Sequence, residues 1–96
     1  MKLENLMDGV LYEIVSGNKD IDIKSICYDS RKVKEGSMFV CLTGFQSDGH
    51  DYIDAAVEKG ATALLVEKDV EVKGNVTVVR VMDTRVILSH VASNFF

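Results

Sequence analysis

Apolar residues recur along the chain at two kinds of spacing, and each predicts a different element. A spacing of three or four residues predicts helices over residues 2–10, over residues 49–59 and from Asp83 or Thr84 to the end. Alternating or continuous apolar runs predict strands at residues 12–15, 22–28, 37–42, 61–66 and 76–81. The run at 37–42 is apolar on both faces, which is typical of a strand covered on two sides.

The order of these elements predicts the fold class. The strand at 37–42, the helix at 49–59 and the strand at 61–66 follow one another with short joints, which makes a βαβ unit. Its two strands should therefore be parallel, with a right-handed crossover. We expect an α/β fold: a single small domain, residues 1–96, in which helices pack on a mixed sheet of about four to five strands.

Composition and charge narrow the range of functions. The 96 residues are 47% hydrophobic, enough for one packed core, and the formal net charge is -4. That sign argues against nucleic acid or an anionic membrane as a partner. No apolar run approaches the roughly 20 residues needed to cross a bilayer, and no signal-peptide stretch opens the chain, so we expect a cytoplasmic location. Cys27 and Cys41 are expected to be buried reduced thiols, with a disulfide as the alternative.

The loop between the strand at 37–42 and the next helix is the first candidate binding site. Gly44 and Gly49 permit backbone angles, or a close approach, that side chains would block. The amide of Gln46 offers a donor and an acceptor together, which matches the edge of a nucleobase. Phe45 offers a stacking or packing surface beside it. Asp48 is the expected N-cap of the helix that follows.

The second candidate is the connector Tyr28-Asp29-Ser30-Arg31. Asp29 and Arg31 are suited to a local ion pair, whereas the Ser30 hydroxyl is suited to a phosphate or a ribose. A capping carboxylate at Asp48 would repel a diphosphate, so we expect the first loop to hold a neutral base and sugar and the phosphates to lie nearer Ser30. This arrangement requires both connectors to converge at one edge of the sheet.

Other patterns argue against several kinds of site. The sequence contains neither G-x-x-x-x-G-K-[ST] nor G-x-G-x-x-G, so it has no standard nucleotide-phosphate loop. Asp48, Asp51 and Asp54 are spaced either for a divalent metal or for helix capping, and we favour capping. His50 is interpreted as a hydrogen-bonding residue at a helix start and His90 as a helix-surface residue. We assign no catalytic residue and no metal ligand.

Several blocks of the sequence resemble the N-terminal domain of the Mur ligases. They are Y-D-S-R-K-V at 28–33, G-S-M-F-V-C-L-T-G at 36–44, D-G-H-D-Y-I at 48–53, K-G-A at 59–61 and D-T-R at 83–85. The resemblance covers about the whole chain, and the order and spacing of the blocks make it specific. Within the family, the chain most resembles the ligase that adds the third residue of the peptidoglycan stem peptide to UDP-N-acetylmuramoyl-L-alanyl-D-glutamate.

The resemblance implies a function and a set of contacts. In this family the first of three domains binds the uridine diphosphate of the sugar substrate, and those contacts fall here on Tyr28, Ser30, Phe45, Gln46 and Ser47. The full enzyme uses ATP and Mg²⁺ and forms an amide bond through an acyl phosphate. Its ATP-binding and C-terminal domains are absent from this chain, so the chain alone should hold no cofactor and should not catalyse.

Two alternatives stay open at this point. One is the same domain of the sister ligase that adds D-alanyl-D-alanine, which shares the D-S-R and D-G-H patterns. The other is a free-standing α/β interaction module without a ligand. The apolar end at Phe95 and Phe96 is more typical of an excised domain than of a complete protein, which argues against the second alternative.

Overall fold

The computed structural model describes residues 1–44 and 46–96. In this part of the chain, five strands form one sheet in the order β1-β5-β4-β3-β2. The strands are β1 (Glu13–Ser16), β2 (Ser25–Cys27), β3 (Ser37–Val40), β4 (Ala63–Val66) and β5 (Thr77–Arg80). Strands β2 to β5 are parallel to their neighbours and β1 is antiparallel to β5, so the predicted mixed sheet is confirmed.

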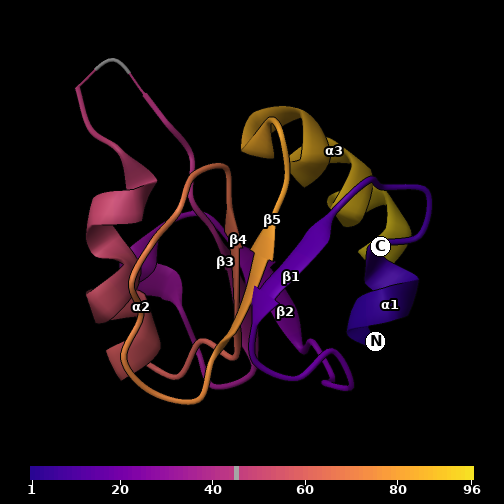
Figure 1. Ribbon diagram of the computed structural model, residues 1–96, viewed down its shortest axis with the longest axis horizontal. Coiled ribbons are helices and arrows are strands. Elements are labelled where there is room, and N and C mark those ends of the chain that lie inside the picture. Colours follow the sequence, from indigo (N-terminus) through magenta and orange to yellow (C-terminus); the bar gives the residue numbers. More distant parts are fainter. Residues whose placement is uncertain (45) are drawn as a thin grey trace.

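Helices cover both faces of the sheet (Figure 1). Helix α2 (Ile53–Glu58) lies on one side, and α1 (Leu3–Leu6) and α3 (Thr84–Phe95) lie on the other. Helix α2 joins the parallel strands β3 and β4, which confirms the predicted βαβ unit. Two short 3₁₀ helices, η1 (Ser30–Lys32) and η2 (Gly49–Tyr52), lie in the connectors. Among the described helices, none has the length and apolar character to cross a membrane.

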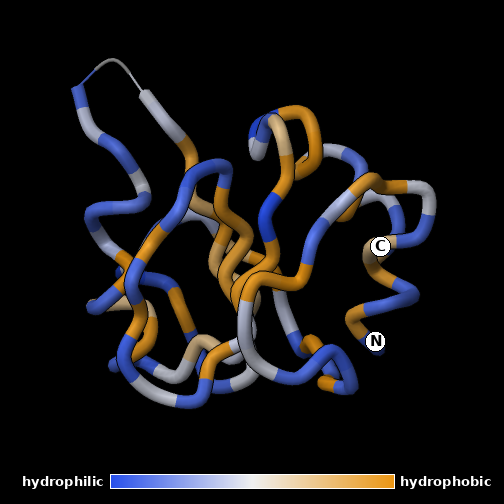
Figure 2. The backbone as a smooth tube through the Cα atoms, in the orientation of Figure 1, coloured by the Kyte–Doolittle hydropathy of each residue, from blue (hydrophilic) through white to orange (hydrophobic). Residues whose placement is uncertain are grey.

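Strands β3 and β4 are buried on both faces, as the apolar run predicts. Successive residues of a strand point to opposite faces, so Met38 and Val40 pack with α1 and α3, whereas Phe39 packs with α2. The same alternation divides β4 between the two sides. Figure 2 shows the resulting concentration of hydrophobic residues in the central strands.

Two predicted helices differ from the observed ones in extent. The helix predicted over 2–10 is a single turn of α-helix, and the turn after it contains Gly9 with a φ of 81°. The helix predicted over 49–59 begins as η2 and becomes α-helical at Ile53. Asp48 accepts a hydrogen bond from the backbone N–H of His50, which stabilises this tighter first turn.

The observed strand β2 is also shorter than the strand predicted over 22–28. Only Ser25–Cys27 pairs with β3. Asp22 instead forms an isolated bridge with Lys2. Both cysteines are free thiols, and burial raises the pKa of Cys41 to about 12. Cys27 is only half-buried, so the expectation of a buried thiol is right for Cys41 alone.

The parallel strands fix where the connectors lie. Because β2 to β5 run the same way, the segments that follow them all leave the sheet at one edge. The connector that begins at Tyr28 and the connector that carries Gly44 are therefore neighbours, as the sequence predicts. In open α/β sheets, ligands bind outside this edge, at the carboxyl ends of the strands.

Candidate functional site

A cavity of about 520 Å³ opens between these two connectors. This volume lies in the range of small-molecule sites. The cavity is lined by Tyr28, Asp29, Ser30, Arg31, Phe39, Leu42, Gly44, Ser47, Gly49, Tyr52 and Arg85. Its lining comes from the connector after β2, the connector after β3 and the start of α3, so segments far apart in sequence form one site.

The connector after β2 is held by its own side chains. The Asp29 carboxylate caps η1 by accepting a hydrogen bond from the backbone N–H of Arg31 at 3.0 Å. The Arg31 guanidinium donates two more hydrogen bonds to that carboxylate, at 3.0 and 2.9 Å. These bonds lower the pKa of Asp29 to about 2. The predicted local ion pair between Asp29 and Arg31 is confirmed. Ser30, which lies between them in the sequence, lines the cavity.

The connector after β3 forms a small hairpin. Thr43 and Asp48 form an antiparallel bridge, and the backbone N–H of Gly44 donates to the Ser47 carbonyl at 2.8 Å. Gly44 and Ser47 line the cavity. Gln46 is exposed at the tip, and it is not among the lining residues in the described part of the chain. Phe45, the other predicted contact at this tip, lies outside the described residues.

Gly49 allows this hairpin to return close to the end of β3. Its backbone N–H donates to the Leu42 carbonyl at 2.7 Å. A Cβ atom at Gly49 would lie 2.6 Å from the Leu42 nitrogen and 3.0 Å from the Cys41 Cα. The expected close approach is therefore confirmed at Gly49. The expected special backbone angle is wrong, since neither Gly49 nor Gly44 has a positive φ.

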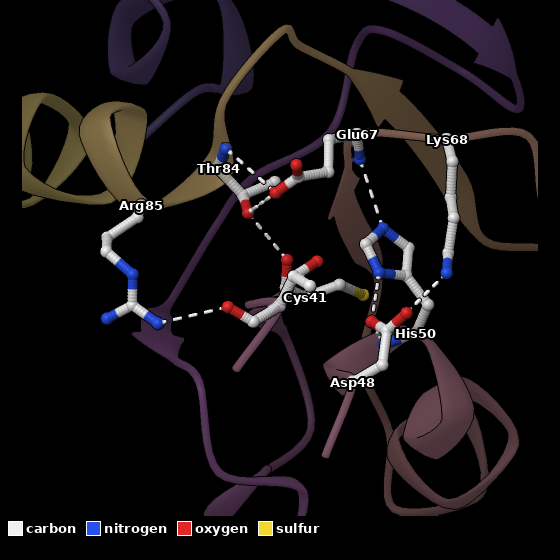
Figure 3. Close-up of polar contacts among 8 residues, drawn as sticks. Cys41, Asp48, His50, Glu67, Lys68, Thr84 and Arg85 are labelled. Atoms are coloured by element: carbon white, nitrogen blue, oxygen red, sulfur yellow. Dashed lines mark hydrogen bonds and ion pairs between the residues drawn. The ribbon is translucent and has the colours of Figure 1, made fainter. Parts of the chain in front are cut away.

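A buried histidine, His50, links Asp48 to Glu67 (Figure 3). The backbone N–H of Glu67 donates to His50 Nε2 at 3.1 Å, so this nitrogen is the acceptor and the ring proton is on Nδ1. His50 Nδ1 lies 2.6 Å from Asp48 Oδ1 and donates to it. The interpretation of His50 as a hydrogen-bonding residue is confirmed. His90, on the exposed side of α3, contacts the Asp8 carbonyl at 3.0 Å.

Asp48 has the capping role that its position predicts. Its carboxylate accepts from the His50 backbone and forms an ion pair with Lys68. The hydrogen bond from Lys68, followed by those from His50, holds the pKa of Asp48 far below its usual range. Within the described residues, no group of three metal-ligating side chains is present, and Asp51 and Asp54 lie in first turns of η2 and α2. Capping therefore accounts for Asp48.

A buried threonine joins three connectors at the same edge (Figure 3). The Thr84 hydroxyl lies 2.7 Å from the Cys41 carbonyl and 2.6 Å from Glu67 Oε1. Of the two residues expected at the start of α3, Asp83 is the cap, and it accepts from the backbone N–H groups two and three residues on. These contacts fix the end of β3, the segment after β4 and the start of α3 relative to one another. The cavity wall is thus held by both local caps and tertiary hydrogen bonds.

The structure brings together three of the five predicted contacts, namely Tyr28, Ser30 and Ser47. It also adds two lining residues that the sequence interpretation missed, Tyr52 and Arg85. Both lie in sequence blocks that carry the resemblance to the Mur ligases, D-G-H-D-Y-I and D-T-R. Membership in these blocks is the sequence feature that could have identified them as site residues. Tyr52 falls at the helical spacing of the predicted helix, and in the structure it is 46% exposed and lines the cavity.

The comparison with protein families decides which family the chain belongs to. A family model described as "Mur ligase family, catalytic domain" matches residues 22–96. The chain belongs to the Mur ligase family. The family named from the sequence blocks is therefore confirmed.

Relatives of known name agree with this assignment. The chain is 49% identical over 96 residues to the UDP-N-acetylmuramoyl-L-alanyl-D-glutamate--2,6-diaminopimelate ligase of Clostridioides difficile (strain 630). It is 43% identical over 96 residues to the ligase of the same name from Clostridium perfringens. Each alignment covers 100% of this chain and 20% of the relative. The chain therefore spans about a fifth of the length of the curated relatives it matches.

Solved structures share the fold. The UDP-N-acetylmuramoylalanyl-D-glutamyl-2,6-diaminopimelate--D-alanyl-D-alanyl ligase from Acinetobacter baumannii superposes with a TM-score of 0.69 at 25% identity, over 97% of this chain and 20% of that one. The MurF ligase from Thermotoga maritima, solved in complex with ADP, gives a TM-score of 0.62 at 31% identity over 71% of this chain and 16% of that one. The small α/β domain with its five-stranded sheet is thus a fold that Mur ligases contain.

Proposed function

We propose that this chain is the N-terminal substrate-binding domain of a peptidoglycan-precursor ligase, and that its cavity binds the uridine diphosphate end of UDP-N-acetylmuramoyl-L-alanyl-D-glutamate. The observation that carries the proposal is the convergence of the Tyr28 and Gly44 connectors on one cavity at the carboxyl ends of the strands. The cavity is wide enough for a nucleotide and is lined by hydroxyls, aromatic rings and guanidinium groups.

Each predicted contact has a distinct task in this proposal. Tyr28 stands 62% exposed at the rim, where its ring offers a stacking face to the uracil. Ser30 and Ser47 line the cavity, and in the proposal their hydroxyls donate to ribose or phosphate oxygens. Gln46 is exposed, and in the proposal its amide bonds to the base; Phe45, which lies outside the described residues, remains a predicted stacking surface.

The third-residue ligase is favoured over the ligase that adds D-alanyl-D-alanine. The relatives named UDP-N-acetylmuramoyl-L-alanyl-D-glutamate--2,6-diaminopimelate ligase are 43% and 49% identical to this chain over its full length. The superposed D-alanyl-D-alanyl ligase from Acinetobacter baumannii is 25% identical, and the MurF ligase from Thermotoga maritima is 31% identical over 71% of this chain. The names of the curated relatives give 2,6-diaminopimelate as the added amino acid, and we extend this to the protein that contains this chain. A free-standing interaction module is disfavoured by membership in the ligase family.

In this proposal the chain contributes to the reaction by positioning the substrate. It would hold the nucleotide end while the distant carboxylate reaches the ATP site on another domain of the enzyme, in a cytoplasmic reaction of cell-wall synthesis that serves cell shape and division. ATP and Mg²⁺ do not fit the described residues, which contain no triad of metal ligands, and the sequence has no phosphate loop. We therefore derive no catalytic step from this chain.

Alanine variants of two predicted contacts test the proposal by calorimetric titration with UDP. Ser30→Ala should weaken UDP binding by about 3- to 10-fold, the effect of one lost hydrogen bond. Gln46→Ala should weaken it by about 1–3 kcal/mol if ligand buries its amide. Ser89→Ala, on the exposed face of α3, is the matched control and should leave binding unchanged. No UDP binding at millimolar concentration, or equal binding of ADP, would contradict the proposal.

A further inference from the structure

The cavity contains a cation that the proposed contacts leave unused. Arg85, in the first turn of α3, lines the cavity beside the hairpin. Its Nη2 donates to the Thr43 carbonyl at 3.3 Å. In the part of the chain that the structure describes, its guanidinium has no carboxylate within ion-pair distance. Asp83 bonds to the Arg85 backbone N–H and not to this side chain.

The other cation in the described lining, Arg31, is already paired. The Arg31 guanidinium donates hydrogen bonds to both carboxylate oxygens of Asp29. Lys68, which is not among the described lining residues, forms an ion pair with Asp48. Asp29 is the one acidic residue among the described lining residues, and Arg31 neutralises it. The described lining therefore carries one net positive charge, and that charge belongs to Arg85.

The chemistry of a guanidinium group favours a phosphate as the ligand of this charge. The group carries five N–H donors in a planar fork, and the Thr43 carbonyl takes one of them. The remaining donors match two oxygens of a phosphate, a pairing that is geometrically specific and stronger than a neutral hydrogen bond. The contact with Thr43 also restricts the side chain before ligand arrives, which reduces the entropy lost on binding.

We infer that Arg85 is the residue that binds the diphosphate of the uridine nucleotide. The inference rests on the proposed function and extends it, because it divides the site into a base-and-ribose part and a phosphate part. The phosphate part is supplied by α3 from the far end of the chain. It changes the expectation that the phosphates lie nearer Ser30, because Arg85 lies beside the hairpin at the Thr43 carbonyl.

The test compares UDP with uridine, which lacks the phosphates, by following amide shifts in the 96-residue chain. Arg85→Ala should weaken UDP binding by about 10-fold or more and leave uridine binding unchanged. Arg85→Lys should recover part of the UDP affinity, because it restores the charge and not the fork. The salt dependence of UDP binding should also be smaller in Arg85→Ala than in the wild type. Lys73→Ala, which removes an exposed charge outside the cavity lining, is the matched control.

The possible results separate this inference from the proposed function. Unchanged UDP affinity in Arg85→Ala would overturn the assignment of Arg85 and leave the proposed function standing. An equal loss for UDP and uridine would also overturn it, since Arg85 would then act only by holding the hairpin through Thr43. Absence of UDP binding to the wild-type chain would overturn both.

Discussion

Gly49→Ala is expected to remove UDP binding and to lower the free energy of unfolding by about 1–3 kcal/mol, the usual cost of overpacking. The added Cβ would lie 2.6 Å from the backbone nitrogen of Leu42, and no flexible side chain can yield at that point. The hairpin must move away from the end of β3, which stretches the 2.7 Å hydrogen bond between Gly49 and Leu42. Since both residues line the cavity, its wall moves with them.

Gly44→Ala is the matched control in the same connector. A Cβ at Gly44 would approach only the Ser47 carbonyl oxygen, at 3.2 Å, which a small shift of the hairpin relieves. Urea denaturation gives the two stabilities, and calorimetric titration gives the two UDP affinities. Equal effects of the two substitutions on stability and on binding would show that the approach of Gly49 to β3 does not organise the site.

Asp48→Ala is expected to cost about 2–4 kcal/mol of unfolding free energy, because it removes a helix cap and strands a buried donor. The backbone N–H of His50 and its ring Nδ1 both donate to Asp48 Oδ1, at 2.9 and 2.6 Å. The His50 side chain is 3% exposed, so the substitution leaves a buried ring donor without its protein acceptor. Lys68 loses its ion-pair partner as well.

Asp51→Ala distinguishes capping from a shared acidic site. Asp51 is exposed in η2, and its substitution should change stability by no more than about 0.5 kcal/mol, as for other surface positions. Chemical denaturation of both variants at pH 7 measures the difference. If the two substitutions cost the same, the three aspartates act as a unit and the capping account is wrong.

The Asp48 variant also predicts a pH dependence with a definite sign. The folded-state pKa of Asp48 is lowered, so its stabilising contribution is complete above its unfolded pKa of about 3.9. That contribution is lost as the pH falls from there through the lower folded value. The stability difference between wild type and Asp48→Ala should therefore be constant near neutral pH and should shrink in acid. Asp29, whose pKa is about 2, is present in both proteins and cancels in the difference.

Local chemistry explains why much of the fold could be predicted. The β3–α2–β4 unit follows from apolar runs of different period, and the caps at Asp48 and Asp83 follow from a carboxylate placed just before a helix. The shared edge of the two connectors follows from the parallel direction of the strands alone. Each of these features depends on residues within a few positions of one another, or on the topology that they impose.

Tertiary contacts explain what could not be predicted. Thr84 reads in the sequence as part of a helix start, and only the fold shows that it joins Cys41 to Glu67. The contact between Arg85 and Thr43 spans 42 positions, and no local pattern indicates it. The prediction made α1 too long because the apolar spacing continues beyond Leu6, where the helix ends, into the turn that contains Gly9.

The most direct test of the account is a two-dimensional NMR titration of the labelled 96-residue chain with UDP. The account predicts saturable amide shifts, with a single dissociation constant, at residues 28–31, at the Gly44–Gly49 hairpin and at Arg85. Silence at millimolar UDP, or shifts confined to the opposite edge of the sheet around Gly17 and Gly60, would contradict it.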